Sequence, residues 1–379
     1  MTVPTGARRY NKPVVYEGGG TELISRSEIS ERYAQSLGAR AAWIQPGSSP
    51  VAALVALGVL SARDTLVVPA SYDGTAPLAQ RMPARVLTAP DATAEACTAC
   101  LDAAGESAHV EEPVPSIAAD GCSYASGSGS VAGESACFWY VPALTPDLRV
   151  ADVLALAQAA DAHGAILIVD ITGITPYACQ PLACGAALTA EVLPGGFVAF
   201  AVGHGATGRG RRRRERPGAQ RAYLLLAQRL GATAPVDTAL DELAHTLSAR
   251  GPLMQACMDH ARVIAEYLTC HYAVRSVLYP GLAAHPDHER ATRELQHGFG
   301  RRIRFALPTA DDTAFFLAAP QLRPYRAGAL DYAGGFSTSI EADPVDSRFV
   351  TLVAGIDDPL AIVDSLDQAL RLFCNPPEP

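Results

Sequence analysis

The chain has 379 residues, of which 49% are hydrophobic and 18% charged, and its formal net charge is −9. These proportions are ordinary for a folded globular protein with room for two domains, and they exclude a disordered or fibrous chain. The acidic balance argues against broad nucleic-acid binding. No apolar run is long enough to span a bilayer, and Met1 is followed by no apolar signal segment, so we expect a cytoplasmic protein.

Lysine is almost absent from the sequence. Of its 30 basic residues, 29 are arginine, and the single lysine is Lys12. A lysine amine is the group that forms Schiff bases with carbonyl compounds in enzymes. Chemistry that needs such an amine elsewhere in the chain is therefore excluded.

Apolar runs of strand length alternate with helical segments through the first half of the chain. Residues 1–26 have no clear period and are predicted to form an irregular arm. A helix at 28–37 follows, then a strand, a Pro-Gly-Ser-Ser turn at 46–49 and an apolar helix. Strands that alternate with helices predict a parallel sheet.

The middle of the chain continues this alternation. CFWYVPAL, AILIVD and FVAFAV are predicted strands, and ADVLALAQAADAHG is a predicted helix. The Gly/Ser-rich segment 121–135 is predicted to be a flexible insertion, because its composition cannot pack a core. Helices dominate at 223–272, and strands mixed with helices follow. We expect an arm at 1–26, a large α/β domain at 27–245 and a C-terminal α+β domain at 246–379.

Asp170 is an unusual residue in this pattern, since it is a single acid at the end of the apolar run AILIVD. Ligands of open α/β sheets bind at the carboxyl ends of the strands, which makes Asp170 a candidate for binding or catalysis. The alternative is structural, because aspartate often caps a turn. The sequence leaves both interpretations open.

Two other motifs carry weaker signals. The segment 203–208, GHGATG, has the spacing of a dinucleotide-binding loop, but arginines follow it instead of a helix and an acid. The run 208–218 holds six arginines and is predicted to be a solvated loop, with binding of phosphate, nucleic acid or an acidic partner as the alternative.

Three segments together resemble one enzyme family. Residues 274–307, VRSVLYPGLAAHPDHERATRELQHGFGRRIRFAL, resemble the V-x-x-V-x-Y-P-G-L-x-S-H-P-x-H…GFG signature of the Cys/Met-metabolism enzymes, which include cystathionine γ-synthase, cystathionine lyases and methionine γ-lyase. IVDITGITPYACQPLACGA resembles VVDNTFATPYxxxPLxxGA, and FVTLVAGIDDPLAIVDSLDQAL resembles LVRLSVGIEDxxDLIxDLxxAL. The resemblance implies a PLP-dependent transferase of fold type I, with a large domain of mostly parallel sheet and a smaller α+β C-terminal domain.

The resemblance also assigns roles to individual residues. It implies that Asp170 pairs with the pyridine nitrogen of PLP and that Tyr72 stacks on the cofactor ring. Arg26 remains from a Tyr-Ser-Arg motif that reaches the PLP phosphate of a neighbouring subunit. Gly47 remains from the phosphate turn, which still offers a hydroxyl at Ser48. These five residues are the predicted cofactor contacts of a degenerate pocket.

His204, with Asp170 and Tyr72, is a candidate for whatever chemistry remains. His285 and His288 have the i, i+3 spacing of metal ligands. The family carries the same histidines without a metal, so a structural role at a helix start is favoured and no metal site is expected.

Four residues of the family pattern are missing. The Schiff-base lysine is expected near Gly195 or near Ala199, depending on the direction of counting, and neither position offers an amine. The phosphate tyrosine is Ile24, and the segment Val141–Pro146 lacks the asparagine that meets the phenolic oxygen of PLP. The arginine that binds the substrate carboxylate is Thr351.

These losses predict a catalytically degenerate homologue, a pseudoenzyme that acts as a structural or regulatory partner. The family works as dimers paired into tetramers with each site built from two chains, so we expect a homo-oligomer or a hetero-oligomer with a lysine-bearing paralogue. The arm at 1–26 is expected to pack on a neighbouring chain. Two alternatives stay open: a repurposed enzyme that uses the old pocket for lysine-independent chemistry on a small molecule, and PLP bound without a covalent bond.

Overall fold

The computed structural model of the protein describes residues 26–72, 85–106, 135–204, 206–207, 214–215, 238–325, 335–343 and 346–374. Most of the predicted arm, of the Gly/Ser-rich segment and of the arginine-rich run lies outside these residues. The predictions for those three segments therefore stay predictions.

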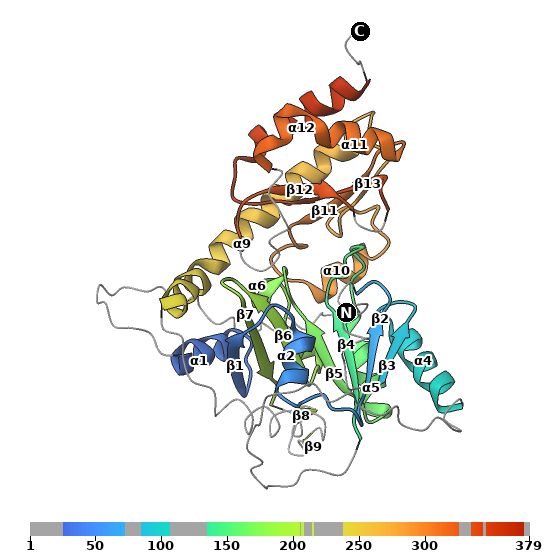
Figure 1. The fold of residues 1–379 in the computed structure, drawn as a ribbon, viewed down its shortest axis with the longest axis vertical. Coiled ribbons are helices and arrows are strands. Elements are labelled where there is room, and N and C mark those ends of the chain that lie inside the picture. Colours follow the sequence, from blue (N-terminus) through green and yellow to red (C-terminus); the bar gives the residue numbers. More distant parts are fainter. Residues whose placement is uncertain are drawn as a thin grey trace, which may run out of the picture.

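Within the described residues, a seven-stranded sheet forms the centre of the large domain, in the order β1-β7-β6-β5-β4-β2-β3 (Figure 1). Strand β7 pairs antiparallel with both β6 and β1, whereas the remaining neighbours pair parallel. The predicted parallel sheet is thus confirmed, with one reversed strand. The strands are β1 (Ala41–Pro46), β2 (Thr65–Pro69), β3 (Arg85–Ala89), β4 (Cys137–Pro142), β5 (Ile166–Asp170), β6 (Leu188–Leu193) and β7 (Phe197–Val202).

Helices cover both faces of this sheet. Buried side chains of α1, α4, α5 and the first part of α9 pack on one face, and α2 packs on the other. Every residue of β5 is buried, which explains why ILIVD shows no alternation of apolar and polar residues. The helices of this domain are α1 (Arg26–Ser36), α2 (Pro50–Ala56), α4 (Ala94–Glu106), α5 (Val153–Ala162), α6 (Thr175–Ala178), α7 (Pro181–Cys184) and α9 (Thr238–Cys270).

The C-terminal domain is built on a four-stranded antiparallel sheet in the order β10-β11-β13-β12. Helices α11, α12 and the end of α9 cover one face, where Phe305, Phe316 and Leu366 are buried together. The opposite face looks toward the large domain (Figure 1), and Arg302 there reaches the carbonyl oxygen of Pro146. The elements are β10 (Ser276–Leu278), α10 (His288–Glu294), β11 (Arg302–Ala306), α11 (Ala310–Ala318), η1 (Pro320–Tyr325), β12 (Ser339–Ala342), β13 (Phe349–Val353) and α12 (Pro359–Cys374).

Helix α9 belongs to both domains. Its residues Met254 and Met258 are buried in the core of the large domain, and Ala261 and Ile264 are buried in the core of the C-terminal domain. The packing therefore changes between Met258 and Ala261, further along the helix than the boundary predicted at 245. In the described part of the chain, no helix combines the length and the apolar character that a membrane crossing requires.

Candidate functional site

The carboxyl ends of β2, β4, β5 and β6 meet at the edge of the large sheet that faces the C-terminal domain (Figure 1). Asp170 ends β5, and Tyr72 lies three residues past the end of β2. Because parallel strands finish at the same edge, the structure brings these two predicted residues together.

Both carboxylate oxygens of Asp170 accept hydrogen bonds from the protein. Oδ1 accepts from the backbone N–H of Thr172 at 2.8 Å and from the Thr172 hydroxyl at 2.5 Å. Oδ2 accepts from the Tyr140 hydroxyl at 2.5 Å. The Thr172 hydroxyl also accepts from the Val192 N–H at 2.9 Å, which joins this turn to β6. Asp170 therefore caps the turn after β5, as one of the two interpretations of the sequence held.

The surroundings of Asp170 shift the ionisation of both partners. Burial raises the pKa of the Asp170 carboxyl above 3.8, and hydrogen bonds from Thr172 and Tyr140 lower it in part. Burial and the charge of Asp170 raise the pKa of the Tyr140 hydroxyl well above 10. Tyr140 is thus a neutral hydrogen-bond donor at physiological pH, not a general base.

Tyr72 extends this arrangement to a third strand. Its ring centroid lies 5.0 Å from that of Tyr140, with the two ring planes at 56°. A hydrogen bond with Tyr72 contributes to the raised pKa of Tyr140. Tyr140 and Asp170 lie on the neighbouring strands β4 and β5, and Tyr72 follows β2 by three residues; we refer to the three as the Tyr72–Tyr140–Asp170 line.

The two positions predicted for the missing lysine lie in different places. Gly195 is in the turn between β6 and β7, at the edge where Asp170 lies, with a φ of +73°. Ala199 is fully buried inside β7, within the core on the α1 side of the sheet. Asp170 bonds Tyr140, whose ring is buried on the α2 side. A side chain at 199 would point away from Asp170, so the structure favours Gly195 as the lysine position.

The predicted phosphate turn makes structural contacts. The Gly47 N–H donates to the Gly196 carbonyl oxygen at 2.8 Å, and a Cβ at position 47 would come within 3.2 Å of Val198. The Ser49 hydroxyl accepts from a backbone N–H of α2 and caps that helix, whereas Ser48 is exposed. Arg26 begins α1, and its side chain lies outside the described part.

The structure does not bring His204 to this edge. Strand β7 runs opposite to its neighbours, so the residues after it lie near the amino ends of β5 and β6. The Gly203 N–H donates to the Ala187 carbonyl oxygen, just before β6 begins, and His204 is exposed. Asp170 is level with Phe200 through Ala190, roughly 13 Å along the strand from residue 204.

Thr351, which occupies the position of the family's carboxylate-binding arginine, lies in a buried cluster of polar side chains. The Thr351 hydroxyl donates to Asp343 Oδ2 at 3.2 Å, and Arg304 Nε donates to the same oxygen at 2.7 Å. Arg304 lies directly opposite Thr351 on the adjacent strand, so a guanidinium is present one strand away. Asp343 neutralises it and the Phe349 ring covers it at 4.8 Å, which leaves it poorly placed to clamp a substrate carboxylate.

Sequence reasoning missed Tyr140, Thr172 and a buried cluster on the other face of the sheet. In this Glu191 cluster, Glu191 of β6 accepts from the Tyr33 hydroxyl of α1 at 2.5 Å and forms an ion pair with Arg250 of α9. Burial raises the pKa of Glu191, and Arg250 and Tyr33 lower it in part. The signals in the sequence were Glu191 and Tyr140, which are polar residues within mostly apolar strands. Their partners are distant along the chain.

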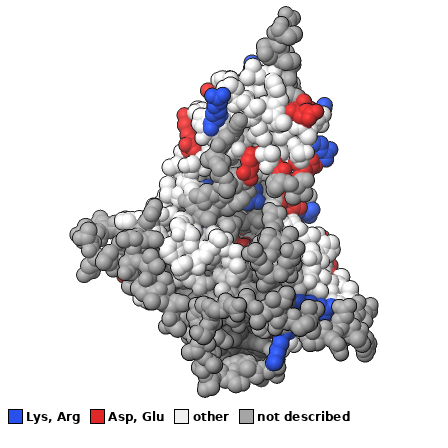
Figure 2. Space-filling view, in the orientation of Figure 1, with Lys and Arg blue, Asp and Glu red and all other residues white. Residues whose placement is uncertain are grey.

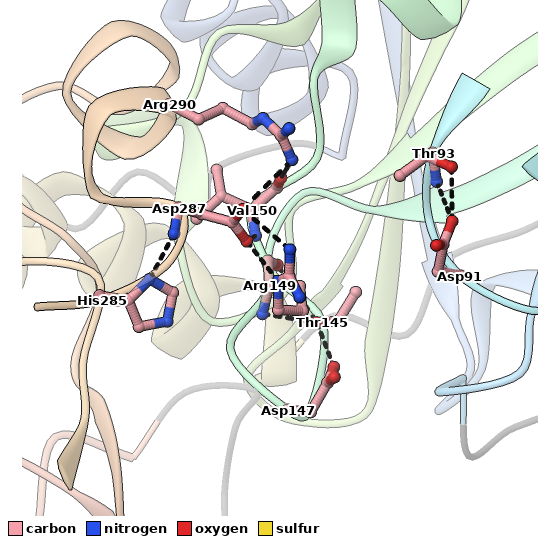
Figure 3. A network of polar contacts seen from close by, with 9 residues as sticks. All are labelled: Asp91, Thr93, Thr145, Asp147, Arg149, Val150, His285, Asp287 and Arg290. Atoms are coloured by element: carbon pink, nitrogen blue, oxygen red, sulfur yellow. Dashed lines mark hydrogen bonds and ion pairs between the residues drawn. The ribbon is translucent and has the colours of Figure 1, made fainter. Parts of the chain in front are cut away.

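A network of polar contacts holds α10, whose Ala291 is buried in the core of the large domain, against the turn after β4 (Figure 3). Asp287 accepts from Arg149 Nε at 2.6 Å, from Arg149 Nη2 at 3.0 Å and from the Val150 N–H at 3.1 Å. Arg290 donates to the Val150 carbonyl oxygen at 3.0 Å, and the Asp287 N–H donates to His285 Nδ1 at 3.1 Å. These bonds fix the turn after β4 to the start of α10.

The two histidines with metal-like spacing both contact the backbone. His285 accepts the Asp287 N–H, and Nδ1 of His288 lies 2.8 Å from the Pro280 carbonyl oxygen. Among the described residues there is no group of three His, Cys, Asp or Glu side chains that could hold a metal ion. Both rings shape the turn that leads into α10.

Acidification is expected to weaken this junction. Burial lowers the pKa of His285 below 6.5. Burial raises the pKa of Asp287, but bonds from Arg149 and Val150 outweigh it and hold the pKa below 3.8. The folded state therefore binds fewer protons than the unfolded state, and stability falls as pH drops below about 6.5 through His285 and below about 4 through Asp287.

The variant His285→Asn checks the histidine contribution, since an amide oxygen can accept the Asp287 N–H in place of Nδ1. Between about pH 7 and about pH 5, the urea midpoint of the native protein should fall more than that of H285N. Parallel profiles for the two proteins would show that His285 makes no such contribution.

The described residues do not fit PLP in the way that the family resemblance implies. The sequence places its single lysine at Lys12, far from the site segment. The Oδ2 atom of Asp170 is already bonded to Tyr140, and the ring of Tyr72 packs against Tyr140.

Comparison with known proteins agrees with the sequence resemblance. Residues 129–323, about half of the chain, match the family model described as Cys/Met metabolism PLP-dependent enzyme. The chain is 30% identical over 247 residues to cystathionine gamma-synthase of Mycobacterium tuberculosis, covering 61% of each protein. It is 32% identical over 176 residues to cystathionine beta-lyase of Lactococcus lactis, covering 46% of this chain and 44% of the relative. The alignments thus span less than two thirds of these relatives.

Solved structures show the same fold. Cystathionine gamma synthase from Xanthomonas oryzae, in complex with aminoacrylate and cysteine, superposes with a TM-score of 0.69 at 22% identity, covering 92% of this chain and 85% of that one. An apo methionine gamma lyase from Micromonospora echinospora gives a TM-score of 0.66 at 24% identity, covering 91% and 86%. The predicted fold type I architecture is confirmed. From its motifs, its family match and its fold, the chain belongs to the family of Cys/Met metabolism PLP-dependent enzymes.

Proposed function

We propose that this chain is a cytoplasmic member of its family that has lost aldimine chemistry and acts as a non-catalytic structural or regulatory partner. The observation that carries the proposal is the absence of any lysine after Lys12. A lysine amine both anchors PLP as an aldimine and moves the substrate α-proton, so a single loss removes two functions.

The geometry around the site supports this proposal. The turn at Gly195, the favoured lysine position, is built for glycine, with a φ of +73°. Asp170 is engaged by Tyr140, and the carboxylate-binding position, Thr351, is bonded to Asp343. Asp170 and Thr351 thus each make a hydrogen bond within the chain, which supports the loss of their ligand contacts.

The resemblance makes a second chain the natural partner, because the sites of this family are shared between subunits. We propose either a homo-oligomer or a hetero-oligomer with a family member that carries the lysine. Figure 2 shows charged side chains of both signs interspersed on the C-terminal domain, with no broad basic patch among the described residues of that face. This mixture is ordinary for a solvated surface and gives no electrostatic support to nucleic-acid binding.

A repurposed enzyme is the second candidate function, and the Tyr72–Tyr140–Asp170 line is the observation that favours it. Two hydroxyl groups and a carboxylate at the carboxyl edge of the sheet could bind and orient a small polar molecule. PLP bound without a covalent bond is a weaker form of the same idea.

Purification from the native cells at natural abundance, followed by native mass measurement, tests the proposal. A mixed complex with a lysine-bearing family member is the expected result for a regulatory partner, and a ligand-free homo-oligomer fits a structural role. A homo-oligomer that retains a small molecule would favour the repurposed enzyme. A strictly monomeric protein would contradict the partner role.

A further inference from the structure

Tyr140 places its hydroxyl on the oxygen of Asp170 that a ligand at the carboxyl edge of the sheet would need. We infer that Tyr140 excludes pyridinium rings, including that of PLP, from Asp170 by making within the chain the hydrogen bond that the ring nitrogen would make. This inference deepens the proposed function and rests on it, because it explains why loss of the lysine is accompanied by loss of the cofactor site.

The strand register fixes this contact. Tyr140 is paired with Ile168 and Pro142 with Asp170, so Tyr140 lies two residues before the level of Asp170 on the adjacent strand. Side chains two residues apart share a face of a sheet, and the Tyr140 ring therefore runs along the face toward the carboxylate. Tyr140 is fully buried among residues on the α2 side, so its ring cannot turn aside without disturbing that core.

The capacity of the carboxylate is nearly used. Thr172 donates twice to Oδ1 and Tyr140 donates once to Oδ2. A carboxylate offers about four acceptor positions, so three are occupied. When the Asp170 carboxyl group is ionised, its hydrogen bond from the neutral Tyr140 hydroxyl is stronger than an ordinary hydrogen bond between two neutral groups. The remaining position is on Oδ2 beside the Tyr140 hydroxyl, so a ring nitrogen reaches Oδ2 only by displacing or crowding that hydroxyl.

Access is restricted from outside as well. Tyr72 is half-buried, whereas Tyr140 and Asp170 are buried. A ring that approaches along the Tyr72–Tyr140–Asp170 line therefore meets two phenol rings before the acid. In this geometry Tyr72 packs on a protein side chain, Tyr140, at the place where the resemblance would have it stack on a cofactor.

The variant Tyr140→Phe removes the hydroxyl and keeps the ring. It leaves Oδ2 without its donor inside the protein, so a cationic N–H from a ligand gains a vacant acceptor. We expect Y140F to bind PLP at least about tenfold more tightly than the native protein, the ratio expected from one charge-assisted hydrogen bond. Tyr140→Val removes the ring as well. It tests the inference in the case that the phenyl ring left in Y140F is enough to obstruct PLP.

The control is Tyr33→Phe, because Tyr33 is also a buried tyrosine that donates at 2.5 Å to a buried carboxylate, that of Glu191, on the other face of the same sheet. Dissociation constants for PLP are measured by calorimetry on the full chain, with circular dichroism to confirm folding. Y33F should bind PLP no better than the native protein. The double variant Y140F/D170N should lose the gain, because an amide cannot replace a carboxylate as the partner of a pyridinium.

Two results would overturn the inference: no gain in either Y140F or Y140V, or a native protein that already binds PLP through Asp170 as tightly as Y140F does. Treatment of each sample with borohydride tests the proposed function independently of the role of Tyr140. A reduced pyridoxyl group on Lys12 would contradict the proposed function, whatever the ratio of the affinities. If no such adduct forms and neither Y140F nor Y140V gains affinity for PLP, only the role of Tyr140 is contradicted.

Discussion

Replacing Arg250 by methionine is expected to lower the free energy of unfolding by about 3–5 kcal/mol, the usual cost of leaving one member of a buried ion pair without its partner. Glu191 is fully buried, and Arg250 provides its counter-charge. Methionine preserves most of the side-chain length, so the loss reports the charge rather than a cavity. Chemical denaturation of the native and variant proteins measures the difference.

The pH dependence and a control variant sharpen this test. Loss of Arg250 raises the pKa of Glu191 further, so the destabilisation should shrink as the pH falls and Glu191 becomes neutral. Arg262→Met removes an exposed pair with Glu266 and should have little effect. Replacing Tyr33, Glu191 and Arg250 together by Phe, Leu and Met should recover most of the lost stability. Equal losses for R250M and R262M would contradict this account of the Glu191 cluster.

Ala199→Lys is expected to destabilise the fold by about 4 kcal/mol or more, because overpacking adds to the cost of burying an ammonium group, which the neighbouring Glu191 carboxylate, already paired with Arg250, offsets only in part. Ala199 is fully buried in β7, and its neighbours across the ladder are Ile44 and Glu191. Ala199→Met is the matched control, because it has similar length without the charge and should cost about 1–3 kcal/mol by overpacking.

Gly195→Lys should be tolerated better. Its turn lies at the edge of the sheet, and the positive φ adds a cost of about 1 kcal/mol for a side chain. Neither lysine variant should turn over cystathionine, since Asp170 remains bonded to Tyr140 and Thr351 remains unable to bind a carboxylate as an arginine would. Turnover by G195K would show that the site has decayed less than we propose. A stable A199K protein would contradict the placement of that residue.

The parallel sheet and most of its strands could be predicted because buried strands appear in the sequence as short apolar runs. The runs ILIVD and FVAFAV are apolar throughout because helices cover both faces of the sheet, and both form strands as expected. Strand β6 was not predicted, since Thr189, Ala190 and Glu191 interrupt its apolar character. The turn at 194–196 that follows it was also missed, although Pro-Gly-Gly is a strong turn signal.

The direction of β7 explains the misplaced candidate. His204 follows an apolar strand, as Asp170 does, and the sequence does not reveal that β7 is reversed. The antiparallel pairing with β6 carries His204 to the edge opposite Asp170. The two lysine positions fall on different parts of this hairpin, because Gly195 lies in its turn and Ala199 lies inside β7.

The candidate site could be predicted only where the chain itself brings residues together. Asp170 and Thr172 are two apart, and an aspartate cap was one of the interpretations offered. Tyr140 and Asp170 are thirty positions apart, and their contact depends on the register between two strands. That register decides whether Asp170 is available to a ligand, and no local sequence pattern predicts it.

The most direct test of the central claim is the intact mass of the purified protein after incubation with PLP and reduction with borohydride. The account predicts an unchanged mass, because no residue after Lys12 offers a lysine amine to form a reducible aldimine. A stoichiometric pyridoxyl adduct that peptide mapping assigns to Lys12, together with a visible absorption band that borohydride abolishes, would contradict it.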